Sequence, residues 1–402
     1  MKGESPVPAL VCGEIGLVRS LGEAGIPVYV GSYYDDNIAY YSRYCARKVR
    51  FSHSLARDFV DRLIELGKAE QRKMVFFSDD DRAVLTFSAH RRELEPYYYF
   101  NLPDHTLVDS ILDKRKFASL AESKGLPVPR SFMPSSAEEA EAFAKKVGYP
   151  CILKPSHKDD WWHPQFREVV GPYRKAILCR DREELTGYFT KIVRINPAVV
   201  MQEYVDGDDL DLYSVNLYCN AAGEPLAYFI GHKLRVYPIH AGVGSLVETV
   251  HEEEVAAAAL QATRALGLRG HVNIQFKRDR RNRTLKIMEM HTRNSLWAYL
   301  ATGSGLNITA IAYYDMIGTP CPLNSGLRYG TRWIDLNKDV KALLDYRKTG
   351  EWTVRRWLAS YAGKKVFHVH SMKDPAPLFM DSWFLIKRYF SNMNARGAAP
   401  HA

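Results

Sequence analysis

Apolar and polar positions near the start of the chain predict a strand, a turn, a helix and a second strand. The apolar residues 9–12 lead into a turn at residues 13–16, and an amphipathic stretch then runs to Gly25. Two further apolar runs, residues 26–30 and 73–78, have the length of buried strands. This alternation indicates a doubly wound α/β unit. The turn lacks the full GxGxxG spacing, so it does not indicate a dinucleotide site.

Three aspartates, Asp79, Asp80 and Asp81, directly follow the last of these apolar runs. Ligand-contacting residues gather at the carboxyl edge of a parallel sheet, so these side chains are candidates for a substrate role. Such a run more often caps the helix that follows, and the sequence leaves both interpretations open.

The middle of the chain contains a lysine in an unusually apolar setting. Residues 113–125 have the pattern of a capped amphipathic helix that ends at a glycine, and residues 150–155, PCILKP, predict a strand whose only charge is Lys154. Because an unpaired ammonium is costly to remove from water, Lys154 either contacts an anion such as phosphate or reaches solvent from an edge strand. Residues 156–173 are aromatic and polar without a clear period, which is typical of a loop or lid.

Residues 198–205 predict a buried strand, followed by the acidic turn DGDDLD and a hairpin that reverses at residues 220–223. An alanine-rich helix then opens at Glu252 and ends at Gly267. Together these patterns predict a second, antiparallel sheet with a helix packed on it.

Four residues between this hairpin and the alanine-rich helix are candidates for binding an anion. Lys233 and Arg235 precede a glycine-rich segment that contains Gly244 and Ser245. Cationic side chains and free backbone N–H groups within a dozen residues favour an anion contact, although the glycines could equally form only a turn.

Residues 271–297 predict a hairpin that brings charged groups together. Val272, Ile274 and Phe276 alternate with polar residues, and the charged residues 279–284 form the turn. Every second residue of a strand lies on the same face. On the returning strand, the residues predicted to share one face are Leu285, Ile287, Glu289 and His291.

Gln275 lies on the face opposite Val272, so pairing of the two strands lets it face Glu289 and His291, just ahead of Arg293. These side chains are potential partners of a metal ion or a phosphate. An ordinary hairpin with a solvated edge remains the alternative.

Composition adds limits to this picture. With 402 residues, of which 46% are hydrophobic and 25% charged, the chain suits two or three globular domains. A net charge of +9 fits a polyanionic ligand such as a nucleotide, whereas no aromatic and basic patch indicates nucleic acid. The six cysteines have no CxxC spacing, which favours a reducing compartment. We find no membrane-spanning run or signal core, so we expect a cytoplasmic protein without membrane insertion.

Several stretches, in the right order, resemble motifs of the ATP-grasp superfamily from about residue 9 to residue 320. They are DKRKFASLAESKGLPVP, YPCILKP, MQEYVDGDD, NIQF and IMEMHTR. The resemblance is strongest to stand-alone ATP-grasp carboxylate-amine ligases, and the central stretch also resembles carbamoyl phosphate synthetase. It implies a chain of the α/β class, in which an N-terminal doubly wound pre-ATP-grasp domain is followed by the two subdomains of the α+β ATP-grasp fold. The implied divisions are a pre-ATP-grasp domain (1–110), an N-terminal subdomain (111–197), a C-terminal subdomain (198–325) and a helical extension (326–402).

The resemblance also implies roles for individual residues. Gln202 would meet the adenine amino group, the backbone of Glu203 and Val205 the ring edge, and Asp209 the ribose. The phosphate-contacting lysines would be Lys114 and Lys154. The metal ligands would be Gln275, Glu289 and His291. The catalytic residues would be Lys154, Asn273 and Arg293. The candidates for contacting the acceptor or acyl phosphate remain Lys233, Arg235, Gly244 and Ser245.

Two departures from the family pattern are visible. The segment SHKDDWWHPQF lies where the family has a glycine-rich phosphate loop, but it contains no glycine. The next glycine along the chain is Gly171. His291 stands where the family has an asparagine. Imidazole suits manganese better than magnesium, so His291 either coordinates a metal or points at a phosphate or substrate. We favour the second interpretation, in which Glu289 and Gln275 hold magnesium.

The function implied by the resemblance is a ligase that uses ATP and Mg²⁺ (or Mn²⁺). It would activate a small-molecule carboxylate as an acyl phosphate and join it to an amine, releasing ADP and phosphate. The alternatives are a biotin-carboxylase-like or carbamoyl-forming enzyme, and a nucleotide-binding pseudoenzyme with a regulatory role. The sequence leaves open a homodimer, the two substrates and the role of the C-terminal extension.

Overall fold

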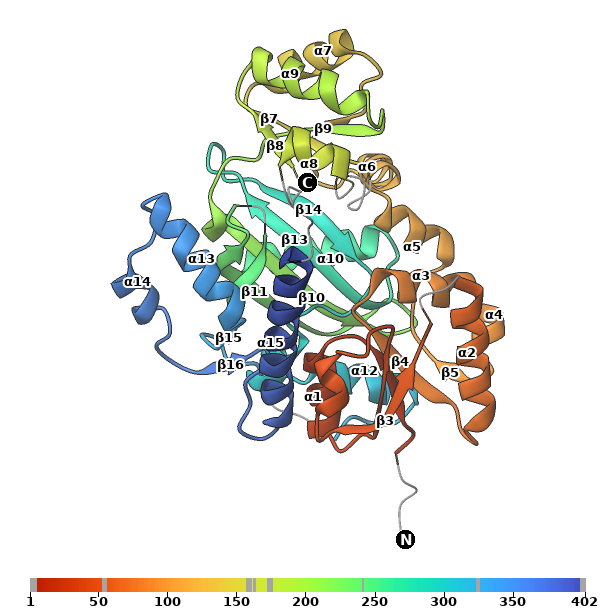
Figure 1. Ribbon diagram of the computed structural model, residues 1–402. Helices are drawn as coiled ribbons and strands as arrows, with labels where there is room; N and C mark the ends of the chain where they lie inside the picture. Colours follow the sequence, from red (N-terminus) through yellow and green to blue (C-terminus); the bar gives the residue numbers. More distant parts are fainter. Residues whose placement is uncertain are drawn as a thin grey trace.

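The computed structural model describes residues 6–52, 56–156, 161, 164–171, 176–240, 242–322 and 326–397. Figure 1 shows the helix-flanked small sheet at one end of the molecule, the large sheet in the middle and the N-terminal unit beside it. No helix in these ranges is both long and apolar enough to cross a lipid bilayer.

The N-terminal unit is a parallel sheet with helices around it. Its elements are β1 (Ala9–Cys12), α1 (Ile15–Glu23), β2 (Val28–Ser32), η1 (Ile38–Tyr41), β3 (Cys45–Arg50), α2 (Ala56–Ala69), β4 (Met74–Ser78), α3 (Asp81–Ala89), α4 (Arg91–Leu94), β5 (Tyr98–Tyr99) and α5 (His105–Leu112). The strand order is β3-β2-β1-β4-β5. Every residue of the central strands β1 and β4 is buried, as expected for a parallel sheet covered on both faces. The doubly wound arrangement is therefore confirmed.

A four-stranded antiparallel sheet forms the next unit, in the order β6-β9-β7-β8. Its elements are α6 (Lys114–Ser123), β6 (Ser131–Phe132), α7 (Ala137–Val147), β7 (Cys151–Pro155), α8 (Pro164–Val170), β8 (Ile177–Cys179), α9 (Arg182–Val193) and β9 (Val199–Glu203). Because β9 pairs with β7, this subdomain extends past the expected boundary at residue 197.

Part of the stretch predicted as a loop or lid is helical, since α8 lies within it. The rest of that prediction falls mainly on residues 157–160, 162–163 and 172–173, which lie outside the described ranges.

The large sheet has the order β14-β13-β10-β11-β12-β15-β16. Its first elements are η3 (Asp209–Asp211), β10 (Leu212–Cys219), β11 (Pro225–Tyr237), β12 (Val243–Val250), α10 (Glu253–Ala265), β13 (Gly270–Arg278) and β14 (Leu285–His291). The remaining elements are α11 (Ala298–Gly303), α12 (Ile308–Met316), β15 (Arg332–Ile334), α13 (Leu336–Lys348), α14 (Val354–Ala359), β16 (Lys365–Phe367) and α15 (Ala376–Gly397). The C-terminal extension is therefore not only helical, because β15 and β16 continue the sheet.

The two faces of the large sheet differ in character. Val215, Ile274 and Phe276 belong to the apolar core that also contains the buried residues of α10. The alternate positions Ser214 and Asn273 face the other way and hydrogen-bond to each other. We call this second side of β10, β13 and β14 the polar face.

The returning strand β14 does not keep the single face that its spacing predicts. Its register with β13 shifts between Gln275 and Phe276, so that Glu289 pairs with Gln275 while Ile287 pairs with Phe276. This irregularity places Ile287 in the apolar core, and Glu289 comes to the polar face. The prediction of one shared face for Leu285, Ile287, Glu289 and His291 is wrong for this reason.

Candidate functional site

Lys154 extends from the small sheet on the side away from its apolar core. In β7 the residues Cys151 and Leu153 pack into that core, and strand alternation turns Lys154 the other way. Its Nζ donates to Oε1 of Gln202 on β9 at 2.6 Å. Burial, the charge of Lys114 and the charge of Lys277 lower the pKa of Lys154 to about 8, while Glu289 opposes them. The positive charges of Lys114, Lys154 and Lys277 therefore lie close enough to repel one another, and a bound anion would offset this repulsion.

The other two lysines come from different elements. Lys114 is the first residue of α6, whose N-terminus is capped by Asp113. Lys277 lies on the polar face, and its Nζ donates to the carbonyl of Gly207 at 2.7 Å. The lysine cluster of Lys114, Lys154 and Lys277 thus spans both sheets, and the sequence did not point to Lys277.

The residues predicted to meet adenine lie at the junction between the sheets. Glu203 donates its backbone N–H to the carbonyl of Arg130 at 2.8 Å, and its carboxylate accepts the Arg130 backbone N–H at 3.1 Å. Val205 is buried just beyond the end of β9. Their predicted contacts with the ring stay predictions.

Asp209 is placed differently from its prediction. It is 6% exposed, and its Oδ2 accepts the hydroxyl of Tyr346 at 2.5 Å and the backbone N–H of His240 at 3.0 Å. Its carboxylate is thus engaged with the C-terminal extension through α13, which the family pattern could not reveal. We therefore leave Asp209 out of the ribose site.

Two of the predicted metal ligands meet on the polar face. Nε2 of Gln275 donates to Glu289 at 3.2 Å, and Oε1 of Gln275 accepts from Lys233 at 2.6 Å. Glu289 is half exposed, so its carboxylate is accessible to solvent. One carboxylate and one amide oxygen suit magnesium, which keeps several waters and takes phosphate oxygens as further ligands. The oxygen atoms of Glu289 and Gln275 therefore fit the magnesium ion that the family resemblance implies.

His291 lies between two carboxylates. Its Nε2 is 3.5 Å from Glu289 and its Nδ1 is 3.4 Å from Asp81. Burial opposes the charged form, yet the charge of Glu289 and the hydrogen bond with Asp81 raise the pKa of His291. Within the described ranges no group of three or more His, Cys, Asp or Glu side chains is arranged to hold a metal. This setting suits an imidazolium better than a metal ligand.

Arg293 is held by a residue of the N-terminal unit. Its Nε donates to Oδ1 of Asp81 at 2.5 Å, and its Nη2 lies 3.4 Å from Oδ2 of the same carboxylate. Burial raises the pKa of Asp81, but the hydrogen bond from His291 and the charge of Arg293 together lower it well below its usual range. The guanidinium is thereby fixed beside the polar face.

The three consecutive aspartates thus have separate tasks. Asp80 caps α3 by accepting the N–H of Ala83, and Asp79 accepts the N–H of Glu14 at 3.0 Å. The helix-capping interpretation is confirmed for Asp80. Asp81 was a candidate site residue because the three aspartates follow a parallel strand, at the carboxyl edge of the sheet.

Asn273 lies at 3% exposure within a buried network on the polar face. Its Nδ2 donates to Oγ of Ser214 at 2.7 Å and to Oδ1 of Asn216 at 2.6 Å. It pairs across the ladder with His291. These hydrogen bonds hold the Asn273 side chain in place, and a catalytic role for it stays a prediction.

The four anion candidates separate into two pairs. Lys233 lies 5.5 Å from the centre of the Trp297 ring, and Gly244 is packed so closely that a Cβ atom would lie 3.0 Å from the same ring. Arg235 and Ser245 instead both bond to the buried carboxylate of Asp339.

Shifts in the β11–β12 register separate Lys233 from Arg235, although they are two residues apart. Arg235 is fully buried and forms an ion pair of 2.7 Å with Asp339. The structure therefore does not bring Arg235 or Ser245 to the candidate site, and only Lys233 and Gly244 remain in it.

A further titratable cluster lies where the N-terminal unit meets the C-terminal extension. His368 lies 3.5 Å from both Glu14 and Asp335, and these contacts outweigh burial and raise its pKa to about 9. Burial and the charge of Glu14 raise the pKa of Asp79 to about 7. No local pattern connects this cluster, because Glu14 and Asp79 lie more than 250 positions before Asp335 and His368.

Known proteins share both sequence and fold with this chain. Residues 113–158 match the family model "Carbamoyl-phosphate synthase L chain, ATP binding domain". The chain is 21% identical over 374 residues to the D-aspartate ligase of Enterococcus faecium, which covers 87% of each protein.

Two solved structures have the same fold. One is biotin carboxylase from Campylobacter jejuni in a β-γ-ATP complex, with a TM-score of 0.61, 15% identity, and 81% of this chain and 74% of that chain covered. The other is the biotin carboxylase domain dimer of Hydrogenobacter thermophilus 2-oxoglutarate carboxylase with MgADP, ADP and bicarbonate. It has a TM-score of 0.59, 16% identity, and 82% of this chain and 74% of that chain covered.

Proposed function

We propose that the chain, as a member of the ATP-grasp superfamily, is an ATP-dependent ligase that activates a carboxylate as an acyl phosphate and joins it to an amine. The products would be an amide or peptide bond, ADP and phosphate. The observation that carries this proposal is the convergence of the lysine cluster with Glu289, Gln275 and Arg293 between the small sheet and the large sheet.

Each of these groups has a task in phosphoryl transfer. The lysine cluster would offset the triphosphate charge, and Gln202, which already bonds Lys154, would meet the adenine. Glu289 and Gln275 would hold Mg²⁺, which supplies charge neutralisation at the phosphates when it is bound. Arg293, fixed by Asp81, would stabilise the charge that builds on the transferred phosphoryl group.

The second step would take place at the edge of the N-terminal unit. The amine attacks the acyl carbon, the C–N bond forms, and phosphate leaves with the electrons of the bond between the acyl carbon and its oxygen, taking up the proton that the attacking nitrogen loses. The ammonium must first lose a proton, and Asp79, whose pKa is about 7, would accept it. Lys233 would hold the donor carboxylate before its activation.

A mixture of amino acids tests this function through release of ADP. We expect ADP only when ATP, magnesium, a carboxylate donor and an amine are all present. D-aspartate is the first donor to test, because the similar protein from Enterococcus faecium is named for it. The function fails if no combination of acid and amine raises ADP release above background.

A second candidate is activation of bicarbonate, because the similar Hydrogenobacter thermophilus structure is a complex with MgADP, ADP and bicarbonate. In that case bicarbonate alone would replace the organic acid in the same assay. ADP release that needs bicarbonate and is unchanged by organic acids would favour this candidate.

A further inference from the structure

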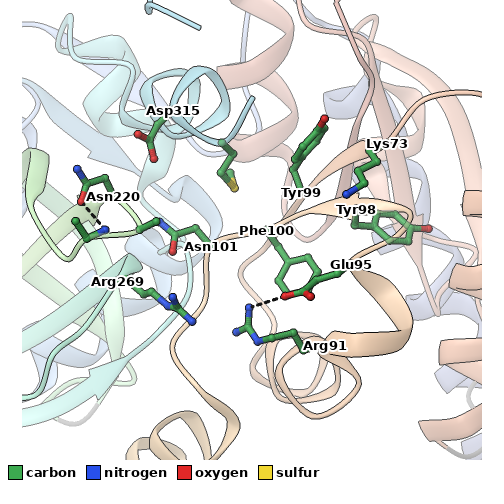
Figure 2. Close-up of a pocket in the computed structure, with 13 residues that line it drawn as sticks. Lys73, Arg91, Glu95, Tyr98, Tyr99, Phe100, Asn101, Asn220, Arg269 and Asp315 are labelled. Atoms are coloured by element: carbon green, nitrogen blue, oxygen red, sulfur yellow. Dashed lines mark hydrogen bonds and ion pairs between the residues drawn. The ribbon is translucent and has the colours of Figure 1, made fainter. Parts of the chain in front are cut away.

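A cavity of about 700 Å³ lies between the N-terminal unit and the large sheet, and none of its lining residues belongs to the candidate functional site (Figure 2). Its walls come from α4 and β5, from the turn between β10 and β11, and from the end of α12. Its volume falls within the range of roughly 300–1,000 Å³ that is usual for small-molecule sites.

Two guanidinium groups are fixed side by side in this cavity. Nη2 of Arg91 and Nε of Arg269 both donate to the carbonyl of Leu102 at 2.8 Å. Burial and the charge of Arg269 lower the pKa of Arg91, while Glu95, 3.6 Å away, opposes them. In the described part of the chain no carboxylate pairs with Arg269. An anion would relieve this repulsion.

The backbone holds the pair in place before any ligand arrives. Gly270, at φ +73°, packs so closely on residue 101 that a Cβ atom would lie 1.9 Å from the carbonyl oxygen of Asn101. Asn101 is itself anchored, because its Nδ2 donates to the carbonyl of Cys219 at 2.9 Å. Arg269 is therefore presented by a rigid wall.

An apolar surface adjoins these charges. Tyr99 is 37% exposed, and Nζ of Lys73 lies 5.3 Å from the centre of its ring. Phe100 and Met316 also line the cavity. A ring-bearing anion would therefore find both a flat apolar contact and positive charge here.

A smaller cavity of about 20 Å³ connects this region to the candidate site. Phe100, Asn101 and Met316 line both cavities, and the smaller one is also lined by Arg293 and Asn294. Residues in the walls of the two cavities therefore link the large cavity to Arg293, which is bonded to Asp81.

We propose that the large cavity binds a small organic anion with a flat ring, and that its occupancy changes the affinity of the nucleotide site. The phosphate or carboxylate group of the anion lies at Arg91 and Arg269, and its ring lies against Tyr99. This site goes beyond the proposed function, and neither test below requires turnover.

Calorimetry with phenyl phosphate, benzoate and inorganic phosphate, at saturating ADP, tests the binding. We expect one saturable site for a phenyl anion, with inorganic phosphate weaker than phenyl phosphate. If phenyl phosphate binds more tightly than benzoate, the site prefers a phosphate group. If benzoate binds more tightly, it prefers a carboxylate. Arg269→Gln should weaken binding roughly tenfold or more, as loss of a charge-assisted hydrogen bond does, and Lys73→Ala should weaken it to a smaller extent.

Lys68→Ala is the matched control, since it removes an exposed lysine outside the cavity and should change nothing. If Arg269→Gln does not fold, the exposed Lys73→Ala decides. The proposal is overturned if neither phenyl anion binds the wild type saturably, or if both cavity variants bind as the wild type does.

The coupling is tested by the affinity for ADP with and without a saturating phenyl anion. We expect a change of roughly threefold or more in the wild type, within the usual range of coupling between sites, and a smaller change in Arg269→Gln at an anion concentration that just saturates the wild type. An unchanged affinity in the wild type contradicts the coupling. An equal change in Arg269→Gln at that concentration means direct competition at the nucleotide site and contradicts the coupling equally.

Discussion

Lys154 carries a charge that depends on pH in a range where the protein can be studied. Its pKa of about 8 means that the free site keeps the ammonium below pH 8 and loses it above. We expect the affinity for ATP to fall as the pH rises from 7 to 9.5. Lys154→Arg should remove this dependence, because arginine stays charged, and Lys154→Ala should weaken binding at pH 7 about tenfold or more.

Calorimetric titration of ATP across this pH range is the measurement. Lys146→Ala, on the exposed end of α7, serves as the control for loss of one positive charge. The same pH slope in wild type and Lys154→Arg would assign the titration to another group.

Glu289 and His291 should respond differently to substitution. Since only Glu289 offers a hard anionic oxygen, Glu289→Gln should abolish ADP formation with magnesium and with manganese. His291→Asn should keep magnesium-dependent activity with little change in metal preference, because the imidazole is engaged by two carboxylates. Metal titrations of ADP release measure both. Full activity in Glu289→Gln would refute the metal site, and a large gain in magnesium affinity in His291→Asn would show that the histidine is a ligand.

At the scale of elements, apolar patterning predicted most strands and helices but not the irregularities within them. The alternation of β13 correctly placed Gln275 opposite its apolar core. A register shift in β14 separated Glu289 from the face of Leu285 and Ile287, and register shifts in β11 separated Lys233 from Arg235. A shift of one residue depends on how neighbouring strands pack, so period two in a single strand could not reveal it.

The ion pair of Arg235 and Asp339 is a structural link between β11 and α13. Because it is fully buried, Arg235→Ala leaves an unpaired carboxylate and should cost about 3–5 kcal/mol of unfolding free energy. Urea denaturation measures this loss. Arg57→Ala, which breaks a pair whose side chains are both more than half exposed, should have no measurable effect. A selective rise in the KM for the donor acid, without loss of stability, would instead return Arg235 to the substrate site.

At the scale of the molecule, His368 joins the N-terminal unit to the C-terminal extension through Glu14 and Asp335. Its pKa of about 9 in the folded state exceeds the unfolded value of roughly 6.5. The stabilisation is therefore fully present below pH 6.5 and is lost as the pH rises through 9. Urea unfolding at pH 6 and pH 9.5 should show this loss in the wild type and a smaller one in His368→Gln. Equal losses in both proteins would exclude His368 as the cause.

Contacts between distant parts of the chain were the least predictable. Asp81 and Arg293 are separated by 212 positions, and no local pattern connects them. The sequence could indicate that each lay at the edge of a strand, but their contact depends on how the parallel sheet packs against the large one. The same holds for the cavity between Tyr99 and Arg269.

Trapping of an acyl phosphate by hydroxylamine tests the central claim most directly. With ATP, magnesium and a donor acid identified by ADP release, hydroxylamine takes the place of the amine and converts the activated acyl group into a hydroxamate. We predict one hydroxamate for each ADP, dependent on the acid and lost in Lys154→Ala and Glu289→Gln. ADP release by that acid without any hydroxamate would contradict activation of the carboxylate as an acyl phosphate.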